Sequence, residues 1–208
     1  MKKQILAFLL AFLVLAVFTA CEKLNAEGSA SHKGHSVPDG LDVPSCLIDE
    51  ITRSYSATKF KEGAVSDDAL EAILQSGQKA PSAANGQPWH FTVIKGAGIS
   101  PQVAPRHYAE GAAVIVVSGK TNARFAPAFD CALAAQNIYL AAQSLGLGAR
   151  MYYTGVQDIN DNQKKSLGIP DDYDVQIIIL VGYLDDDADA VSSASPRRPL
   201  SENVNYID

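Results

Sequence analysis

Ala80-Pro81-Ser82-Ala83-Ala84-Asn85-Gly86-Gln87-Pro88-Trp89 lies between a helical pattern and a β-rich run, Phe91-Thr92-Val93-Ile94. Its prolines fix φ, and Gly86 permits a positive φ. Ser82, Asn85 and Gln87 add short side chains that can donate and accept hydrogen bonds. The stretch therefore predicts a rigid loop whose amide groups can face a flat ligand with a polar edge. The alternative is an ordinary helix-to-strand connection.

Two helices are predicted before this loop. Residues 47–53 have apolar side chains on one helical face. Ser66 is a suitable N-cap, because acidic residues follow it in the first turn, and the second helix runs from there to the proline at position 81. Between the helices, Arg53 and Lys59 bracket two serines and a threonine. This cluster suits a phosphate, although a solvated helix end would have the same composition.

Four strands are predicted after this loop, at residues 90–95, 111–118, 149–153 and 175–183. The run at 111–118 is apolar without alternation, which is typical of a strand buried on both faces. The run at 175–183 is the strongest candidate for a central strand. Residues 158–167 predict an exposed helix. Because strands and helices do not alternate regularly, the pattern predicts an α+β fold.

A long helix is predicted from Pro127 to a stop at Gly146-Leu147-Gly148. Apolar side chains occur all around it, so no face is clearly polar. A helix of this kind is buried in the core or in a subunit interface.

The N-terminus has the pattern of a lipoprotein signal: two lysines, an apolar run over residues 5–18 and small residues before Cys21. We predict a signal peptide at 1–20, a lipidated Cys21, a flexible tether at 21–43 and one domain at 44–208. An uncleaved membrane anchor is the alternative. Both place the domain outside the cytoplasm, on a bacterial membrane and most simply at its periplasmic face.

The composition argues against several classes of protein. A net charge of −6 argues against a nucleic-acid partner. No glycine-rich phosphate signature follows a strand, and no nucleophile–base set or metal-ligand spacing occurs. His32 and His35 lie in the tether and are expected to be solvated. Cys46 and Cys131 could pair in an oxidising compartment, but Cys131 lies in the apolar helix and fits a small buried side chain better.

Several short motifs occur in an order that resembles the nitroreductase family of flavin enzymes, over residues 46–208. The motifs are Arg53-Ser54-x-Ser56, Pro81-Ser82-x-x-Asn85-x-Gln87-Pro88-Trp89, Ala135-Gln136-Asn137, Leu145-Gly146-Leu147-Gly148, Leu167-Gly168-Ile169-Pro170, Val181-Gly182-Tyr183 and Arg197-Arg198-Pro199-Leu200. The resemblance implies a mostly antiparallel central sheet flanked by helices, and an intertwined homodimer with FMN between the subunits. The long apolar helix would then form the dimer core.

The resemblance also implies roles for particular residues. Arg53, Ser54 and Ser56 would bind the phosphate and ribityl chain, and Arg197 and Arg198 would complete the phosphate site. Pro81, Ser82, Asn85 and Gln87 would lie along the flavin, in part from the partner subunit. Thr154 and Gly155 would lie near flavin N5. No catalytic side chain is expected, because the flavin carries the chemistry.

The implied activity is a ping-pong transfer of two electrons, as hydride, from a reduced donor such as NAD(P)H to a nitroaromatic, a quinone or a similar acceptor. Two departures from the family pattern concern the site. Thr58 stands where the family has a second basic residue, and the segment from Lys95 to Gly111 is shorter than the family's insertion. NAD(P)H is scarce outside the cytoplasm, which leaves the donor open. The alternative is a lipoprotein on the same fold that holds flavin or another planar ligand without turnover.

Overall fold

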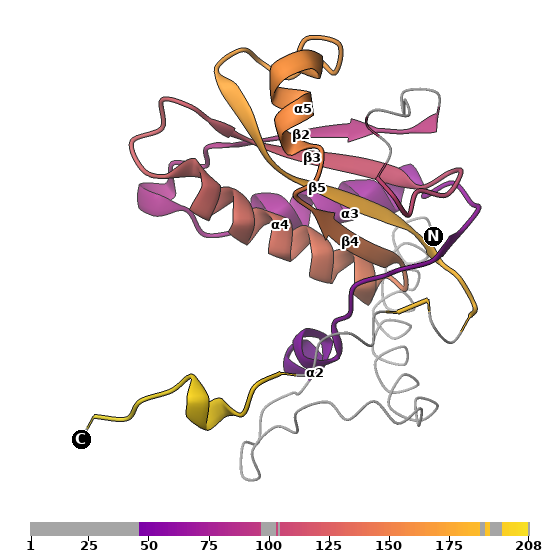
Figure 1. Ribbon diagram of the computed structural model, residues 1–208, viewed down its shortest axis with the longest axis vertical. Coiled ribbons are helices and arrows are strands. Elements are labelled where there is room, and N and C mark those ends of the chain that lie inside the picture. Colours follow the sequence, from indigo (N-terminus) through magenta and orange to yellow (C-terminus); the bar gives the residue numbers. More distant parts are fainter. Residues whose placement is uncertain (1–45, 97–102, 104, 188–189, 192–196, 208) are drawn as a thin grey trace, which may run out of the picture. The chain divides into compact units, whose positions relative to one another are not determined.

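The computed structural model describes residues 46–96, 103, 105–187, 190–191 and 197–207 (Figure 1). The chain divides into two units after Arg53. Of the first unit, the structure describes helix α2 (Cys46–Arg53). The predicted signal peptide, Cys21 and the tether lie outside the described residues. Among the described residues, no helix combines the length and hydropathy of a membrane span.

The second unit is built on a five-stranded sheet in which every pairing is antiparallel. The strands are β1 (Phe60–Lys61), β2 (Trp89–Ile94), β3 (Ala113–Lys120), β4 (Gly148–Tyr152) and β5 (Tyr173–Leu184). Their order is β1-β5-β3-β2, and β4 also pairs with β5. The predicted α+β class, the antiparallel sheet and the central place of 175–183 are confirmed. The two-residue strand β1 was not predicted from the sequence.

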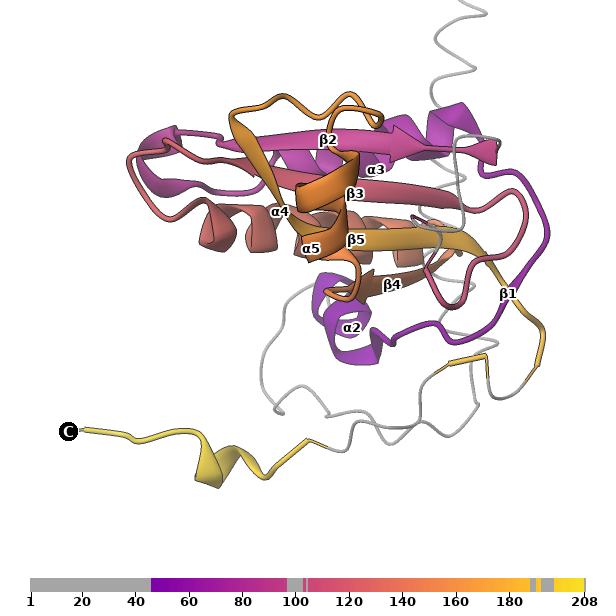
Figure 2. The ribbon, with the colours of Figure 1, turned by 45° about the horizontal axis from the view of Figure 1, so that its top comes forward.

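Both faces of the sheet are covered, and β3 contributes to both cores by alternation. Ala113, Ile115 and Val117 pack with helices α3 (Asp67–Gln78) and α4 (Pro127–Ser144). Val114 and Val116 pack on the opposite face, with α5 (Val156–Asp158) and the π-helical turn η3 (Ile159–Gln163). Figure 2 shows α5 on the side of the sheet away from α3 and α4. The prediction that 111–118 is buried on both faces is confirmed.

Helix α3 begins as the sequence predicts, because the Ser66 side chain accepts the N–H of Ala69 at 3.3 Å. It packs closely on α4 near its C-terminus. A Cβ added at Gly77 would lie 2.7 Å from the Ile138 side chain, so only glycine permits this approach. The close contact fixes where α3 ends, and therefore where the loop at 80–88 begins.

Helix α4 packs Cys131, Ala135, Ile138 and Ala142 on the sheet, all fully buried. Its other face is apolar as well: Phe129 is 68% exposed, and Leu133 and Leu140 are half-buried. The helix ends at Gly146, whose φ of +76° suits glycine. In one chain, therefore, α4 covers the core with one side and presents a second apolar side to the surface.

The predicted helix at 158–167 differs from what the structure shows. The chain forms one short α-helical turn and one π-helical turn over residues 156–163. This segment is also not wholly exposed, because Val156 and Ile159 are buried against the sheet. Residues three positions apart share one face of a helical turn, and here that face packs on the sheet.

Candidate functional site

The loop between α3 and β2 is held by a buried carboxylate. Asp130, in the first turn of α4, is 2% exposed, and its two oxygens accept the N–H of Ala83 at 3.2 and 3.3 Å. Within the loop, Ser82 Oγ accepts the N–H of Gln87 at 3.0 Å, and Gln87 Nε2 donates to the Asn85 carbonyl at 3.4 Å. Pro81, Asn85 and Gln87 are exposed. The loop is thus hydrogen-bonded to α4 and exposed at Asn85 and Gln87, although the Gln87 amide donates back into the loop, and contact with a flat ligand stays a prediction.

The loop carries backbone strain, but not at the glycine. Ala84, Asn85 and Gln87 have φ values of +51°, +55° and +44°, whereas Gly86 has φ −70°. The expectation that Gly86 supplies the positive φ is therefore wrong. A Cβ at Gly86 would lie 3.1 Å from the Ala83 carbonyl oxygen, so its small size serves close packing of the turn. Left-handed residues other than glycine cost about 1–2 kcal/mol each and are concentrated at functional sites.

A second group of predicted residues lies in the segment 54–58, which is fixed by the C-terminal half of α4. The side chain of Gln143 accepts the N–H of Tyr55 and donates to its carbonyl, both at 3.1 Å. Tyr139 donates its hydroxyl to the same carbonyl. The N–H of Ala57 then bonds the Ala149 carbonyl at 3.1 Å. Ser54 and Ser56, half-buried, are carried by this fixed backbone.

Two arginines act on this second group. Arg150, on β4, donates from Nη1 to the Ala57 carbonyl at 3.1 Å. Burial raises the pKa of Tyr139, whereas the positive charges of Arg150 and Arg197 lower it. Arg197, which was predicted to bind phosphate, is therefore within electrostatic range of Tyr139. Arg198 is exposed beside it in the chain. Arg53 ends α2 and belongs to the other unit, so its predicted place in the cluster stays a prediction.

The predicted turn at Thr154-Gly155 follows the end of β4. Gly155 has φ +92° and starts α5, and Thr154 is exposed. Because β3 and β4 run antiparallel to β2 and β5, the turn after β4 and the loop before β2 point toward the same end of the sheet. Strand β4 stops short of that end, opposite Ile178 of β5. Strands β5 and β3 lie between the turn and the loop.

Helix α4 thus anchors two groups of predicted site residues within one chain, and the Thr154-Gly155 turn belongs to neither. Asp130 holds the loop at 80–88 at one end of α4, and Gln143 holds Ser54–Ala57 near the other. A rise of about 1.5 Å per residue puts about 20 Å between these two anchor positions. Sequence reasoning missed Asp130, Tyr139, Gln143 and Arg150. The polar pair Tyr139 and Gln143, one turn apart in an apolar helix, was the available signal.

A histidine–tyrosine pair lies on the face of the sheet opposite α4. His107 Nδ1 and the Tyr152 hydroxyl are 2.7 Å apart, and the guanidinium of Arg150 lies 5.6 Å from the Tyr152 ring centroid. Burial lowers the pKa of His107, and the charges of Arg150 and Arg106 lower it further. Neutral His107 is therefore favoured, and its contact with Tyr152 joins the segment at 105–111 to β4.

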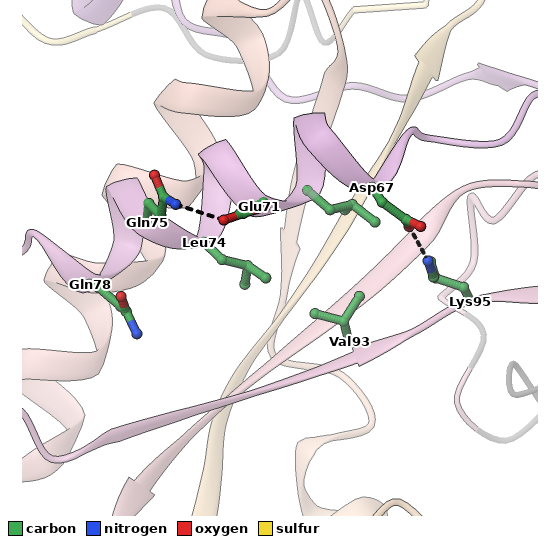
Figure 3. Close-up of a pocket in the computed structure, with 8 residues that line it drawn as sticks. Asp67, Glu71, Leu74, Gln75, Gln78, Val93 and Lys95 are labelled. Atoms are coloured by element: carbon green, nitrogen blue, oxygen red, sulfur yellow. Dashed lines mark hydrogen bonds and ion pairs between the residues drawn. The ribbon is translucent and has the colours of Figure 1, made fainter.

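Two other features stand apart from these groups. A groove of about 460 Å³ between α3 and β2 is lined by Leu74 and Val93 and bridged by the Asp67–Lys95 ion pair (Figure 3). It contains none of the predicted site residues.

Cys131 is fully buried and free, as predicted for a small core side chain. Burial, and then the charge of Asp130, raises the pKa of its thiol to about 12.

The model of the nitroreductase family matches the chain in two overlapping stretches, residues 51–110 and 102–183. A relative from Methanothermobacter thermautotrophicus that bears the name NADH dehydrogenase/NAD(P)H nitroreductase is 31% identical over 157 residues, covering 70% of this chain and 81% of its own. A relative from Archaeoglobus fulgidus with the same name is 31% identical over 156 residues, covering 69% and 88%.

Solved structures agree with the sequence relatives. A nitroreductase from Desulfovibrio desulfuricans, crystallised with FMN, superposes with a TM-score of 0.66 at 28% identity, over 81% of this chain and 99% of its own. An FMN-bound nitroreductase from Bacteroides fragilis gives 0.63 at 21% identity, over 78% and 98%, which shows the shared fold. From the family match and the identity to these relatives, the chain belongs to the nitroreductase family.

Proposed function

We propose that the protein is an FMN-dependent oxidoreductase that acts as a homodimer, with one flavin between the subunits at each of two equivalent sites. The observation that carries this proposal is the arrangement along α4. One end fixes a loop with outward amide groups, and the other fixes a segment with hydroxyls and arginines nearby. These are the two kinds of group that FMN needs, and in one chain their anchor positions on α4 are about 20 Å apart.

The residues present fit FMN in their chemistry. A phosphate dianion needs cations and hydroxyls. Ser54 and Ser56 lie in the segment that Gln143 of α4 holds, and the charge of Arg197 acts on Tyr139 of the same helix. The ring edge of a flavin needs amide donors and acceptors, and Asn85 and Gln87 offer them on a strained, buttressed loop. Arg198 and Arg53 are the further candidates for the phosphate. The Thr154-Gly155 turn would offer backbone dipoles to the flavin near N5.

A homodimer would join the two groups. If α4 packs antiparallel on its own copy across a two-fold axis, the Asp130 end of one chain meets the Gln143 end of the other. The apolar side of α4 is suited to this contact, because Phe129, Leu133 and Leu140 would otherwise remain at the surface. The C-terminal residues 197–207, with Leu200 61% exposed, would add contacts to the partner.

FMN, when bound, supplies hydride transfer between a reduced donor such as NAD(P)H and a nitroaromatic or quinone acceptor. The residues of the chain would bind the flavin and orient it. The loop at 80–88 would fix the ring edge, and the backbone at residues 154–155 would direct its dipoles toward N5. Donor and acceptor would use the same open face in turn, giving ping-pong kinetics. The names of the archaeal relatives support NAD(P)H as donor.

The test is anaerobic reduction of the purified full chain. We expect about one FMN per chain, bleaching of the flavin absorbance by NADH or NADPH, and recovery on adding a quinone. Retained flavin that no donor reduces would favour the carrier alternative. A colourless protein that also fails to bind added FMN would end the proposal.

We further propose that the protein is attached to the bacterial membrane through lipidated Cys21. The support is the sequence alone: the basic start, the apolar run and the small residues before the cysteine. Cys21→Ala should abolish incorporation of labelled fatty acid and move the protein out of the detergent phase. Equal labelling of both forms would contradict this proposal.

A further inference from the structure

Arg150 carries a positive charge that no carboxylate balances among the described residues. Its guanidinium is half-buried, donates one bond to the Ala57 carbonyl at 3.1 Å and covers the Tyr152 ring. The ion pairs of Lys59, Lys61, Lys95, Lys120 and Lys164 with acidic residues do not include Arg150. A half-buried cation without a carboxylate partner is a favourable position for an anion from solution.

The surroundings of Arg150 are positive, although the whole chain is acidic with a net charge of −6. The charges that bear on Tyr139 come from Arg150 and Arg197, and those that bear on Tyr152 and His107 come from Arg150 and Arg106. Arg150 is thus the cation common to all three side chains, and Arg197 adds to its charge at Tyr139 and Arg106 at Tyr152 and His107. Such a concentration attracts an anion with more than one charge.

A hydroxyl is available beside these cations. Ser56 immediately precedes Ala57, whose carbonyl Arg150 bonds, and no described residue hydrogen-bonds the Ser56 side chain. The remaining N–H groups of Arg150 likewise have no acceptor within the described chain, and they are not sealed from solvent. Guanidinium and hydroxyl groups together are the donors that hold phosphate.

We propose that Arg150 is a binding residue for a phosphate monoester, together with Ser56 and Arg197. Resting on the proposed function, this phosphate is the one on FMN. Arg150 lies on β4, outside the segment 53–59 and the C-terminal arm. It would supply, from a neighbouring strand, the charge that the sequence lacks at Thr58. The bond to the Ala57 carbonyl would keep the guanidinium in place before the ligand arrives.

The test compares FMN with riboflavin, which has the same ring but no phosphate. Both dissociation constants are measured by flavin fluorescence on the flavin-depleted full chain and on three variants. Arg150→Gln removes the charge but keeps a donor for the Ala57 carbonyl, and Arg150→Lys keeps the charge. Arg124→Gln is the control, because Arg124 is an exposed arginine stacked on Phe125.

We expect Arg150→Gln to weaken FMN binding by about 10- to 100-fold, the loss of a charge-assisted contact, and to leave riboflavin within about twofold. Arg150→Lys should lose less, and Arg124→Gln should change neither. Equal weakening of FMN and riboflavin would overturn the proposal, because Arg150 would then only support the fold. Unchanged FMN affinity would overturn it too.

A second arm separates failure of this inference from failure of the proposed function. If the wild-type chain binds neither flavin, thermal melting is followed with and without inorganic phosphate. Stabilisation by phosphate that Arg150→Gln abolishes would support the anion site and end the assignment to FMN. Absence of any phosphate effect would overturn the anion site as well.

Discussion

The carboxylate of Asp130 accepts the backbone N–H of Ala83, with both oxygens within 3.3 Å. One residue is at the start of α4 and the other is in the loop that precedes β2. The contact fixes the loop at 80–88 on α4, the helix that also holds the segment 54–58 through Tyr139 and Gln143. A single rigid element therefore determines where both groups of predicted ligand-binding residues lie.

Replacing Asp130 with alanine should destabilise the fold and loosen the loop at 80–88. A buried hydrogen bond to a charged group is worth about 1.5–3 kcal/mol, so the free energy of unfolding should fall by that amount. Urea denaturation measures it, and Asp171→Ala, the loss of an exposed acid, is the control. A loss equal to that of the control would show that the Ala83 contact contributes nothing.

Ala84→Gly should stabilise the protein modestly. Alanine at φ +51° costs about 1–2 kcal/mol, and glycine avoids this cost but adds unfolded-state entropy worth about 0.4–1 kcal/mol. The expected gain in the free energy of unfolding is about 0–1.6 kcal/mol, measured by denaturation. Gly86→Ala should instead be neutral or destabilising, since its Cβ would approach the Ala83 carbonyl. If the two effects are reversed, the assignment of strain within the loop is wrong.

A charge on the outer side of α4 should prevent dimer formation. Phe129 is 68% exposed in one chain, and glutamate there would be buried without a partner in the proposed interface. Light scattering after size exclusion should give twice the chain mass for wild type and the chain mass for Phe129→Glu. Asp161→Lys, on η3, changes a charge away from α4 and should remain dimeric. A wild-type monomer would refute the interface.

Protonation of His107 should make stability depend on pH. Its pKa is lowered in the folded state from the ordinary value of 6.5, by burial and then by Arg150 and Arg106. Below pH 6.5 the unfolded chain therefore binds more protons, so stability falls as the pH is lowered toward the folded pKa. Wild type should lose more stability between about pH 7 and pH 5 than His107→Asn. Parallel pH profiles would exclude this contribution.

Much of the fold follows from the sequence because local patterns agree with tertiary packing. The Ser66 cap, the start of α4 at Pro127 and the buried strand at 113–120 each depend on residues close in the chain. The segment after Gly155 was predicted less well. Its two apolar residues anchor to the sheet, and no periodic pattern in 158–167 reveals that contact.

The ligand-binding residues that the sequence suggests stay a prediction, and sequence reasoning missed the residues that hold them in place. Side chains that face a ligand lie in short motifs, which sequence reasoning can find. The side chains of Asp130, Gln143 and Arg150 hydrogen-bond backbone groups that are distant in the sequence. No local sequence pattern indicates such partners. The error at Gly86 has the same origin, since the positive φ values of its neighbours are maintained by contacts such as that of Asp130 with Ala83.

The distance between the two anchor points of α4 has a genetic consequence. In the proposed dimer, one polypeptide contributes the loop at 80–88 to each flavin site. The other polypeptide contributes the residues that bind the FMN phosphate. A chain defective at Asp130 and a chain defective at Arg150 would each be inactive alone. Co-expressed, they would assemble hybrids in which one of the two pockets receives only intact contributions, and part of the lost activity would return.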